Sequence, residues 1–286
     1  MNTDALPDSF PDRLEGRDGS LTITQAGSIV LVLLLLSIPL AIPTLLTNWL
    51  YDEKGVDLYG VSELLVFATG LWLTIRWAQR RYGIDAPDLT PANRHIVPLM
   101  VYPLLLAGTL CLGILIEPLT VLVPTPDWLK KALEEAFTKN VILSAVIGAP
   151  VFEEWLFRGV ILAGFLKRYS PTTAIVLSAT IFALIHLNPA QSIGAFFIGL
   201  ALGWLFYRTG SLWPGMVVHF INNAASSLVF LSDETMDMTT NTTLAWVGNS
   251  TNYIILLALS AAVVTGCYLG LNRLLPRAIP RQIRVA

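Results

Sequence analysis

The sequence predicts an all-α membrane protein, a polytopic bundle of about eight transmembrane helices. Of its 286 residues, 54% are hydrophobic and only 13% are charged, whereas soluble domains average about 25% charged residues. The mean hydropathy is +0.64, and apolar runs of roughly 20 residues, each long enough for one crossing, recur along the chain. The net charge is only −2, so we expect the lipid bilayer, and not nucleic acid, as a partner.

Residues 1–25 are predicted to form a polar, disordered tail. The tail does not have the basic start of a secretory signal peptide, so we expect a retained membrane anchor to follow it. It carries more acidic than basic residues, namely Asp4, Asp8, Asp12, Glu15 and Asp18 against Arg13 and Arg17.

Eight apolar runs define the expected spans and the organisation of the chain. The runs cover about 26–50, 58–79, 96–123, 139–166, 171–188, 190–207, 211–232 and 252–275. We therefore expect N-terminal spans in 26–126, a catalytic core of four spans in 139–232, an outer loop at 233–251, and a last span with a basic tail in 252–286.

The segment DWLKKALEEAF predicts an interfacial amphipathic helix at 127–138, between the third and fourth spans. Asp127 is a suitable N-cap, and the apolar residues that follow fall on one face. The helix is too short to cross the bilayer, so we expect it to lie in the interface. It could be a simple connector or a gate beside the site described next.

Positive charge is distributed unevenly between the two sides of the expected bundle. An even number of spans puts both termini on one side, and that side then holds 13 Lys and Arg residues against 4 on the other. The excess predicts that both termini are cytoplasmic in a multi-pass protein of the plasma membrane. Cys111 and Cys267 lie in apolar runs and are expected to be small buried residues without a redox role.

Three spans carry polar residues where lipid disfavours them, and in each span two residues stand four apart. The pairs are Glu154 with Arg158, Phe182 with His186, and His219 with Asn223. This spacing puts both members on one helix face, and ionisable residues within a membrane usually serve function. The third histidine, His95, falls in a loop.

Counting residues predicts that these side chains meet. Glu153 lies 14 residues before Lys167, and His186 lies 14 residues after Thr172. At about 1.5 Å per residue both are about 20 Å from the cytoplasmic edge, and Asn223 falls close to the same level. A carboxylate, two imidazoles and an amide are therefore expected in one cavity.

Each polar residue has an expected task. Glu154 and Arg158 stand in the favourable order for an ion pair, which leaves Glu153 free. A desolvated carboxylate such as Glu153 can accept a proton from water, with His186 holding the same water. His219 and Asn223 are suited to donate hydrogen bonds to an oxyanion. Together these residues predict the attack of water on a peptide carbonyl.

The motifs resemble those of the intramembrane glutamic protease family that includes the CAAX prenyl endopeptidases and bacterial homologues tied to bacteriocin processing or immunity. The family pattern EExxxR, FxxxH, HxxxN reads here EEWLFR from Glu153, FALIH from Phe182 and HFINN from His219. The resemblance implies a membrane-embedded endopeptidase with Glu153, His186, His219 and Asn223 as catalytic residues. Glu154, Arg158 and Phe182 would support them, and no metal or cofactor would be needed.

Substrate and mechanism remain open at this point. The expected topology puts the site nearer the outside, which favours an exported or membrane-tethered peptide over a cytosolic prenylated tail. A zinc protease is an alternative, although HExxH is absent. A non-catalytic scaffold or immunity protein is another, and a transporter is a weaker one because no internal repeat is visible.

Overall fold

The computed structural model describes residues 18–54, 59–85, 97–123, 126, 128, 143–232 and 242–275. All regular structure in these ranges is helical, which confirms the predicted class. The elements are α1 (Ile23–Lys54), α2 (Tyr59–Tyr82), α3 (Val101–Val121), η3 (Ser144–Gly148), α5 (Ala149–Glu154), η4 (Trp155–Leu162), α6 (Ala163–Arg168), α7 (Pro171–Leu184), α8 (Pro189–Thr209), α9 (Trp213–Ser232), α10 (Thr242–Val247) and α11 (Ser250–Leu274).

Each of the eight predicted spans overlaps at least one of these helices, in the same order. Five of them, α1, α2, α3, α8 and α11, are long and apolar enough to cross a membrane by length and composition. The other three are the continuous helix from η3 to α6, the 14-residue α7, and α9. These three carry or adjoin the polar residues of the predicted site.

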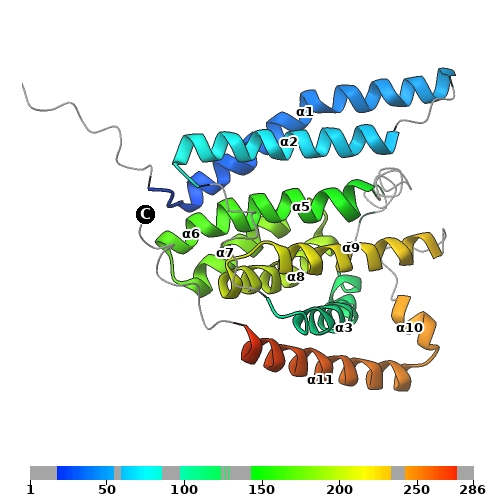
Figure 1. Cartoon of the computed structure of the whole chain (residues 1–286). Coiled ribbons are helices and arrows are strands. Elements are labelled where there is room, and N and C mark those ends of the chain that lie inside the picture. The colour runs from blue at the N-terminus through cyan, green and yellow to red at the C-terminus, as the bar shows by residue number, and fades with distance from the viewer. Residues whose placement is uncertain are drawn as a thin grey trace, which may run out of the picture.

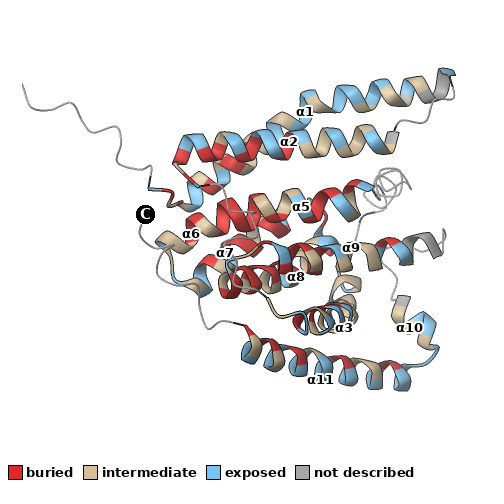
Figure 2. Ribbon diagram, viewed as in Figure 1, coloured by how far each residue is buried: buried red, intermediate tan, exposed pale blue. Residues whose placement is uncertain are grey.

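The helices form three layers (Figure 1). The α1–α2 hairpin lies on one side, α5 to α9 form the middle layer, and α3 with α11 lies on the other side. Burial is concentrated in the middle layer, whereas α1 and α11 expose most of their length (Figure 2). In α1 only 6% of the membrane-spanning window is buried inside the protein, against 44% in α8. The outer helices therefore offer their apolar side chains to lipid.

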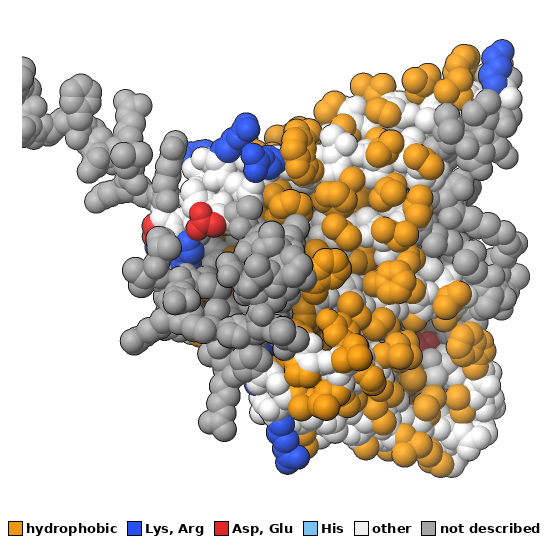
Figure 3. Space-filling model, viewed as in Figure 1, with side chains coloured by type: hydrophobic (Ala, Val, Ile, Leu, Met, Phe, Trp, Pro, Cys, Tyr) orange, Lys and Arg blue, Asp and Glu red, His pale blue; other side chains and the backbone are white. Residues whose placement is uncertain are grey.

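Positive residues gather where four helices end. Arg80 and Arg81 close α2, Lys167 and Arg168 close α6, Arg208 closes α8 and Arg273 closes α11. All four ends lie on the same side of the bundle (Figure 1). Hydrophobic side chains cover the broad band next to this edge (Figure 3). The distribution is that of a membrane protein with one strongly basic edge.

The N-terminal helix begins inside the range predicted as a disordered tail. Thr22 and Gln25 form a capping box: the amide of Gln25 donates to Thr22 Oγ1 at 3.2 Å, and the amide of Thr22 donates to Gln25 Oε1 at 2.8 Å. Leu21 is fully buried, and its amide donates to the carbonyl of Gly164 at 3.1 Å. Residues 18–25 are therefore packed on the protein, while residues 1–17 lie outside the described residues.

Two other predicted segments fall largely outside the described residues. Of the interfacial helix at 127–138 only Trp128 is described. The outer loop 233–251 is described from 242, where it contains the short helix α10. Glu117 of α3 holds this helix, because its Oε1 accepts a hydrogen bond from the amide of Thr243 at 2.9 Å.

Candidate active site

The helix that carries Glu153 and Glu154 has a π-helical segment on each side of them. Ser144–Gly148 and Trp155–Leu162 are π-helical, and the α-helical turns of α5 lie between them. In a π segment each amide bonds to the carbonyl five residues back, and such segments are frequent at functional sites. Pro150 contributes to the first change, because it has no amide hydrogen to offer to the carbonyl of Ala145.

The predicted ion pair is present and buried. Arg158 donates from Nη1 to Glu154 Oε1 at 2.7 Å, and the side chains are 1% and 0% exposed. Arg158 also donates from Nη2 to the carbonyl of Gly199 at 3.4 Å, and its guanidinium lies 4.4 Å from the ring centre of Phe182. The pair thus ties the helix of the glutamates to α7 and α8.

His219 lies between the two glutamates, an arrangement that the sequence does not predict. Its Nδ1 is 3.0 Å from Glu154 Oε1, and its Nε2 is 3.8 Å from Glu153 Oε2. Because the Glu154 carboxylate pairs with Arg158 and can only accept, Nδ1 of His219 carries a hydrogen. Gly215, one turn earlier on α9, leaves space for this contact: a Cβ there would lie 2.8 Å from Glu154 Oε2.

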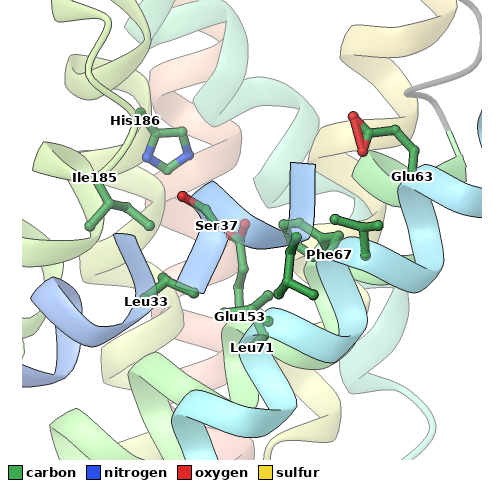
Figure 4. A pocket seen from close by; sticks show the side chains of 11 residues that line it. Leu33, Ser37, Glu63, Phe67, Leu71, Glu153, Ile185 and His186 are labelled. Carbon is green, nitrogen blue, oxygen red and sulfur yellow. The ribbon is translucent and has the colours of Figure 1, made fainter. Parts of the chain in front are cut away.

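Glu153 and His186 line one cavity of about 310 Å³ between the α1–α2 hairpin and the middle layer (Figure 4). Glu153 is 12% exposed, so unlike Glu154 it reaches open space. Nδ1 of His186 is 2.8 Å from the carbonyl of Phe182. A carbonyl only accepts, so in the neutral imidazole the Nδ1 hydrogen is committed and Nε2 keeps a lone pair. Of the four side chains expected in one cavity, Glu153 and His186 line this one, whereas His219 and Asn223 are not among its lining residues.

His186 does not belong to a complete transmembrane helix, which corrects the expected span 171–188. Helix α7 ends at Leu184, and Leu187 adopts a φ of 53° in the turn that follows. Asn188 then caps α8 by accepting from the amides of Ala190 and Gln191, and Pro189 occupies the first turn of α8. An Asn-Pro pair is a common sequence signal for the start of a helix, so the sequence does indicate a turn before Pro189. It holds the imidazole inside the bundle.

Phe182 is the packing residue around which the charged and aromatic groups gather. Its ring meets those of His186 and His219 edge-on, with centroids 5.1 Å and 5.7 Å apart. The ring of Phe157 approaches it at 5.0 Å. These contacts restrict both imidazoles, which agrees with the supporting role expected of Phe182.

Asn223 lies one turn along α9 from His219, and its amide is partly engaged. It donates from Nδ2 to the carbonyl of Ala145 at 2.8 Å, and its Oδ1 accepts from Asn222 Nδ2 at 3.1 Å. This carbonyl of Ala145 is the one that the amide of residue 150 would bond in a π-helix, and Pro150 has no amide hydrogen to donate. One hydrogen of the Asn223 amide remains for a ligand. Asn222, which orients this amide, was not predicted.

Two further features of the cavity were not predicted. Its walls are mainly apolar and come largely from the α1–α2 hairpin, through Leu33, Leu40, Val66, Phe67 and Leu71. Glu63 of α2 also lines the cavity. The sequence signal that could have indicated this is a single carboxylate within an apolar run.

Within the described ranges no group of three or more His, Cys, Asp and Glu side chains is placed to hold a metal ion.

Comparison with protein families agrees with the motifs. Residues 136–225 match the family model described as type II CAAX prenyl endopeptidase, Rce1-like. This range contains Glu153, Glu154, Arg158, Phe182, His186, His219 and Asn223. No curated protein and no solved structure matched the chain. Residues 136–225, which hold all three motifs, are therefore similar to the Rce1-like type II CAAX prenyl endopeptidases.

Proposed function

We propose that this chain is an intramembrane endopeptidase of the glutamic type, which hydrolyses a peptide bond without a metal ion. The observation that carries the proposal is the cavity of about 310 Å³ shared by Glu153 and His186. It puts a carboxylate that reaches open space and an imidazole with a free lone pair beside a space large enough for water and a peptide backbone.

The proposed reaction begins with a water molecule between Glu153 and His186. His186 Nε2 accepts a hydrogen bond from the water, and Glu153 takes a proton as the water oxygen bonds to the carbonyl carbon. The carbonyl oxygen then carries the negative charge of a tetrahedral intermediate. When the C–N bond breaks, Glu153 returns the proton to the leaving nitrogen. The products are a carboxylic acid and an amine, and no group on the enzyme is consumed.

His219 and Asn223 are proposed to stabilise the oxyanion. Asn223 has one amide hydrogen available. Nδ1 of His219 is held by Glu154, so His219 would donate from Nε2 in its doubly protonated form. Glu153 loses its negative charge when it takes the proton from water. The nearby Nε2–H of His219, 3.8 Å away in the resting arrangement, is then released for the oxyanion.

The proposed substrate is a membrane-associated or lipid-modified peptide or protein. The apolar walls supplied by α1 and α2 suit a segment that is itself apolar, and α1 lies at the lipid-exposed side of the bundle. A bilayer and a peptide are thus the proposed partners. An alternative, in which the fold binds a peptide without cleaving it, as a scaffold or immunity protein would, predicts binding without product.

The mechanism is tested by cleavage with and without a chelator. Purified protein should cleave peptides at an unchanged rate in a strong chelator and should contain no stoichiometric zinc, because a carboxylate, an imidazole and water suffice. Mass spectrometry of the products and metal analysis of the same sample provide the measurement. Activity that disappears with the chelator and returns with zinc would establish the zinc-dependent alternative.

We also propose that both termini are cytoplasmic in the plasma membrane, as the 13 to 4 distribution of Lys and Arg favours. Single cysteines at positions 241 and 281, introduced after Cys111 and Cys267 are replaced, should react oppositely with an impermeant thiol reagent added to intact cells. Position 241 should label and position 281 should not. The reverse pattern would invert the topology and make a cytosolic prenylated tail the better substrate.

A further inference from the structure

A second carboxylate, that of Glu63, lines the proposed substrate cavity. Glu63 belongs to α2, within the apolar segment Gly60–Tyr82. Its side chain is half-buried and makes no hydrogen bond or ion pair with any residue that the structure describes. Charged residues within transmembrane helices are costly and usually functional. The catalytic scheme above does not use this group.

Glu63 lies at the end of the cavity lining nearest the start of α2, away from the catalytic groups. It is four residues from the start of α2, or about 6 Å along the helix. Figure 4 shows it at the opposite end of the cavity lining from His186. The hairpin packs on the core at its other end, where Leu21, Ile29 and Ile75 are fully buried. The half-buried charge at this end of the cavity can therefore meet water and an incoming ligand.

The distance from Glu63 to the reacting carboxylate can be counted along the helices. A Cβ at Gly148 would lie 2.8 Å from Leu64 Cδ1, so the start of α2 is level with Gly148. Glu153 follows Gly148 by five residues, which is about 7.5 Å of helix. An extended peptide covers about 3.3 Å per residue. The separation along the helix axes therefore corresponds to the length of two or three residues of an extended substrate.

We propose that Glu63 is a specificity determinant that pairs with a basic side chain of the substrate, two or three residues from the bond that is cleaved. The apolar walls between Glu63 and Glu153 would hold the intervening residues. A carboxylate at one end of an apolar cavity is complementary to a Lys or Arg that follows or precedes an apolar stretch. This proposal rests on the proposed peptidase activity and adds the sequence that the site selects.

The test is a cleavage-site survey with the full chain in detergent, using a mixture of peptides of known sequence. Wild-type sites should be enriched in Lys or Arg two or three residues from the cleaved bond, on one side of it. Glu63→Gln should raise KM for matched basic peptides by up to about fivefold, since an ion pair that retains some solvent contributes up to about 1 kcal/mol. The same variant should leave peptides with Gln in place of Lys or Arg unchanged.

Two further variants sharpen the test. The Glu63→Lys variant should lose the preference for Lys and Arg and should prefer Asp and Glu instead. Glu117→Gln is the matched control, because Glu117 is an acid in α3 outside the cavity whose oxygen accepts from Thr243; it should leave the preference intact. Thermal unfolding in detergent verifies that each variant is folded. If only Glu63→Lys fails to fold, the Glu63→Gln comparison decides.

The outcomes separate the two proposals. Cleavage without enrichment of basic residues, or an enrichment that Glu63→Gln leaves unchanged, overturns the role of Glu63 while the peptidase stands. A folded wild-type protein that cleaves nothing overturns the peptidase, and the role of Glu63 falls with it. A Glu63→Gln effect confined to kcat also overturns the role, since a residue that only binds substrate acts through KM.

Discussion

Glu153→Ala should reduce the rate of peptide cleavage by about 10² to 10⁴-fold, the usual contribution of a general base. The abundance and thermal stability of the protein should remain at wild-type values. The reason lies in the contacts of the side chain: its closest charged partner is Nε2 of His219, at 3.8 Å. Cleavage assays on purified protein, together with size-exclusion profiles of each variant, measure both effects.

Glu154 provides the matched control because it is the adjacent residue and bears the same group. Glu154→Ala removes the carboxylate that holds both Arg158 and His219. It should therefore lower the amount of folded protein, whereas Glu153→Ala lowers activity alone. Near-normal cleavage by a well-folded Glu153→Ala variant would contradict the assignment of the base.

The sequence predicts the elements and the main polar pairs of the site because these follow from local spacing. Glu154 and Arg158 are one helical turn apart, and their ion pair forms as expected. Counting along two helices from the basic edge also places Glu153 and His186 at one level, and both line the cavity. Such predictions need only the helical rise and the positive charges at helix ends.

Long-range packing decides what the sequence does not predict. The π segments change the direction and rise of the helix around the glutamates, and they depend on neighbours as well as on Pro150. The position of His219 between Glu153 and Glu154 requires the close approach of α9 that Gly215 permits. A residue count treats every helix as straight and cannot assign such contacts.

An apolar run in the sequence also does not show where the chain reverses direction inside the bundle. Hydropathy extends the fifth span to 188, whereas α7 ends at Leu184 and His186 lies in a turn. Backbone outside a helix is tolerated at membrane depth where protein surrounds it. Here the side chain of Asn188 and the Ser192 hydroxyl, which donates to the carbonyl of Ala183 at 2.9 Å, satisfy the turn.

Arg158→Ala should destabilise the protein by about 3 to 5 kcal/mol, the usual cost of removing one member of a buried ion pair. Arg158 is 1% exposed, and its loss leaves Glu154 buried with His219 as its remaining charged partner among the described residues. The contact with the carbonyl of Gly199 and the stacking on Phe182 are lost as well. Folded protein recovered from membranes and the midpoint of thermal unfolding in detergent should both decrease.

Two companion variants distinguish a structural role of Arg158 from a chemical one. Arg158→Lys keeps the charge but has no planar fork to reach both Glu154 and Gly199, so it should recover only part of the stability. The double variant Glu154→Gln with Arg158→Gln removes both charges and should be more stable than Arg158→Ala, because no carboxylate is then buried without its cation. Normal abundance of Arg158→Ala with activity lost would instead place Arg158 in the reaction. Activity that declines in parallel with the folded fraction agrees with a structural role of Arg158. In that role the ion pair positions Glu154, and Glu154 holds His219 beside Glu153.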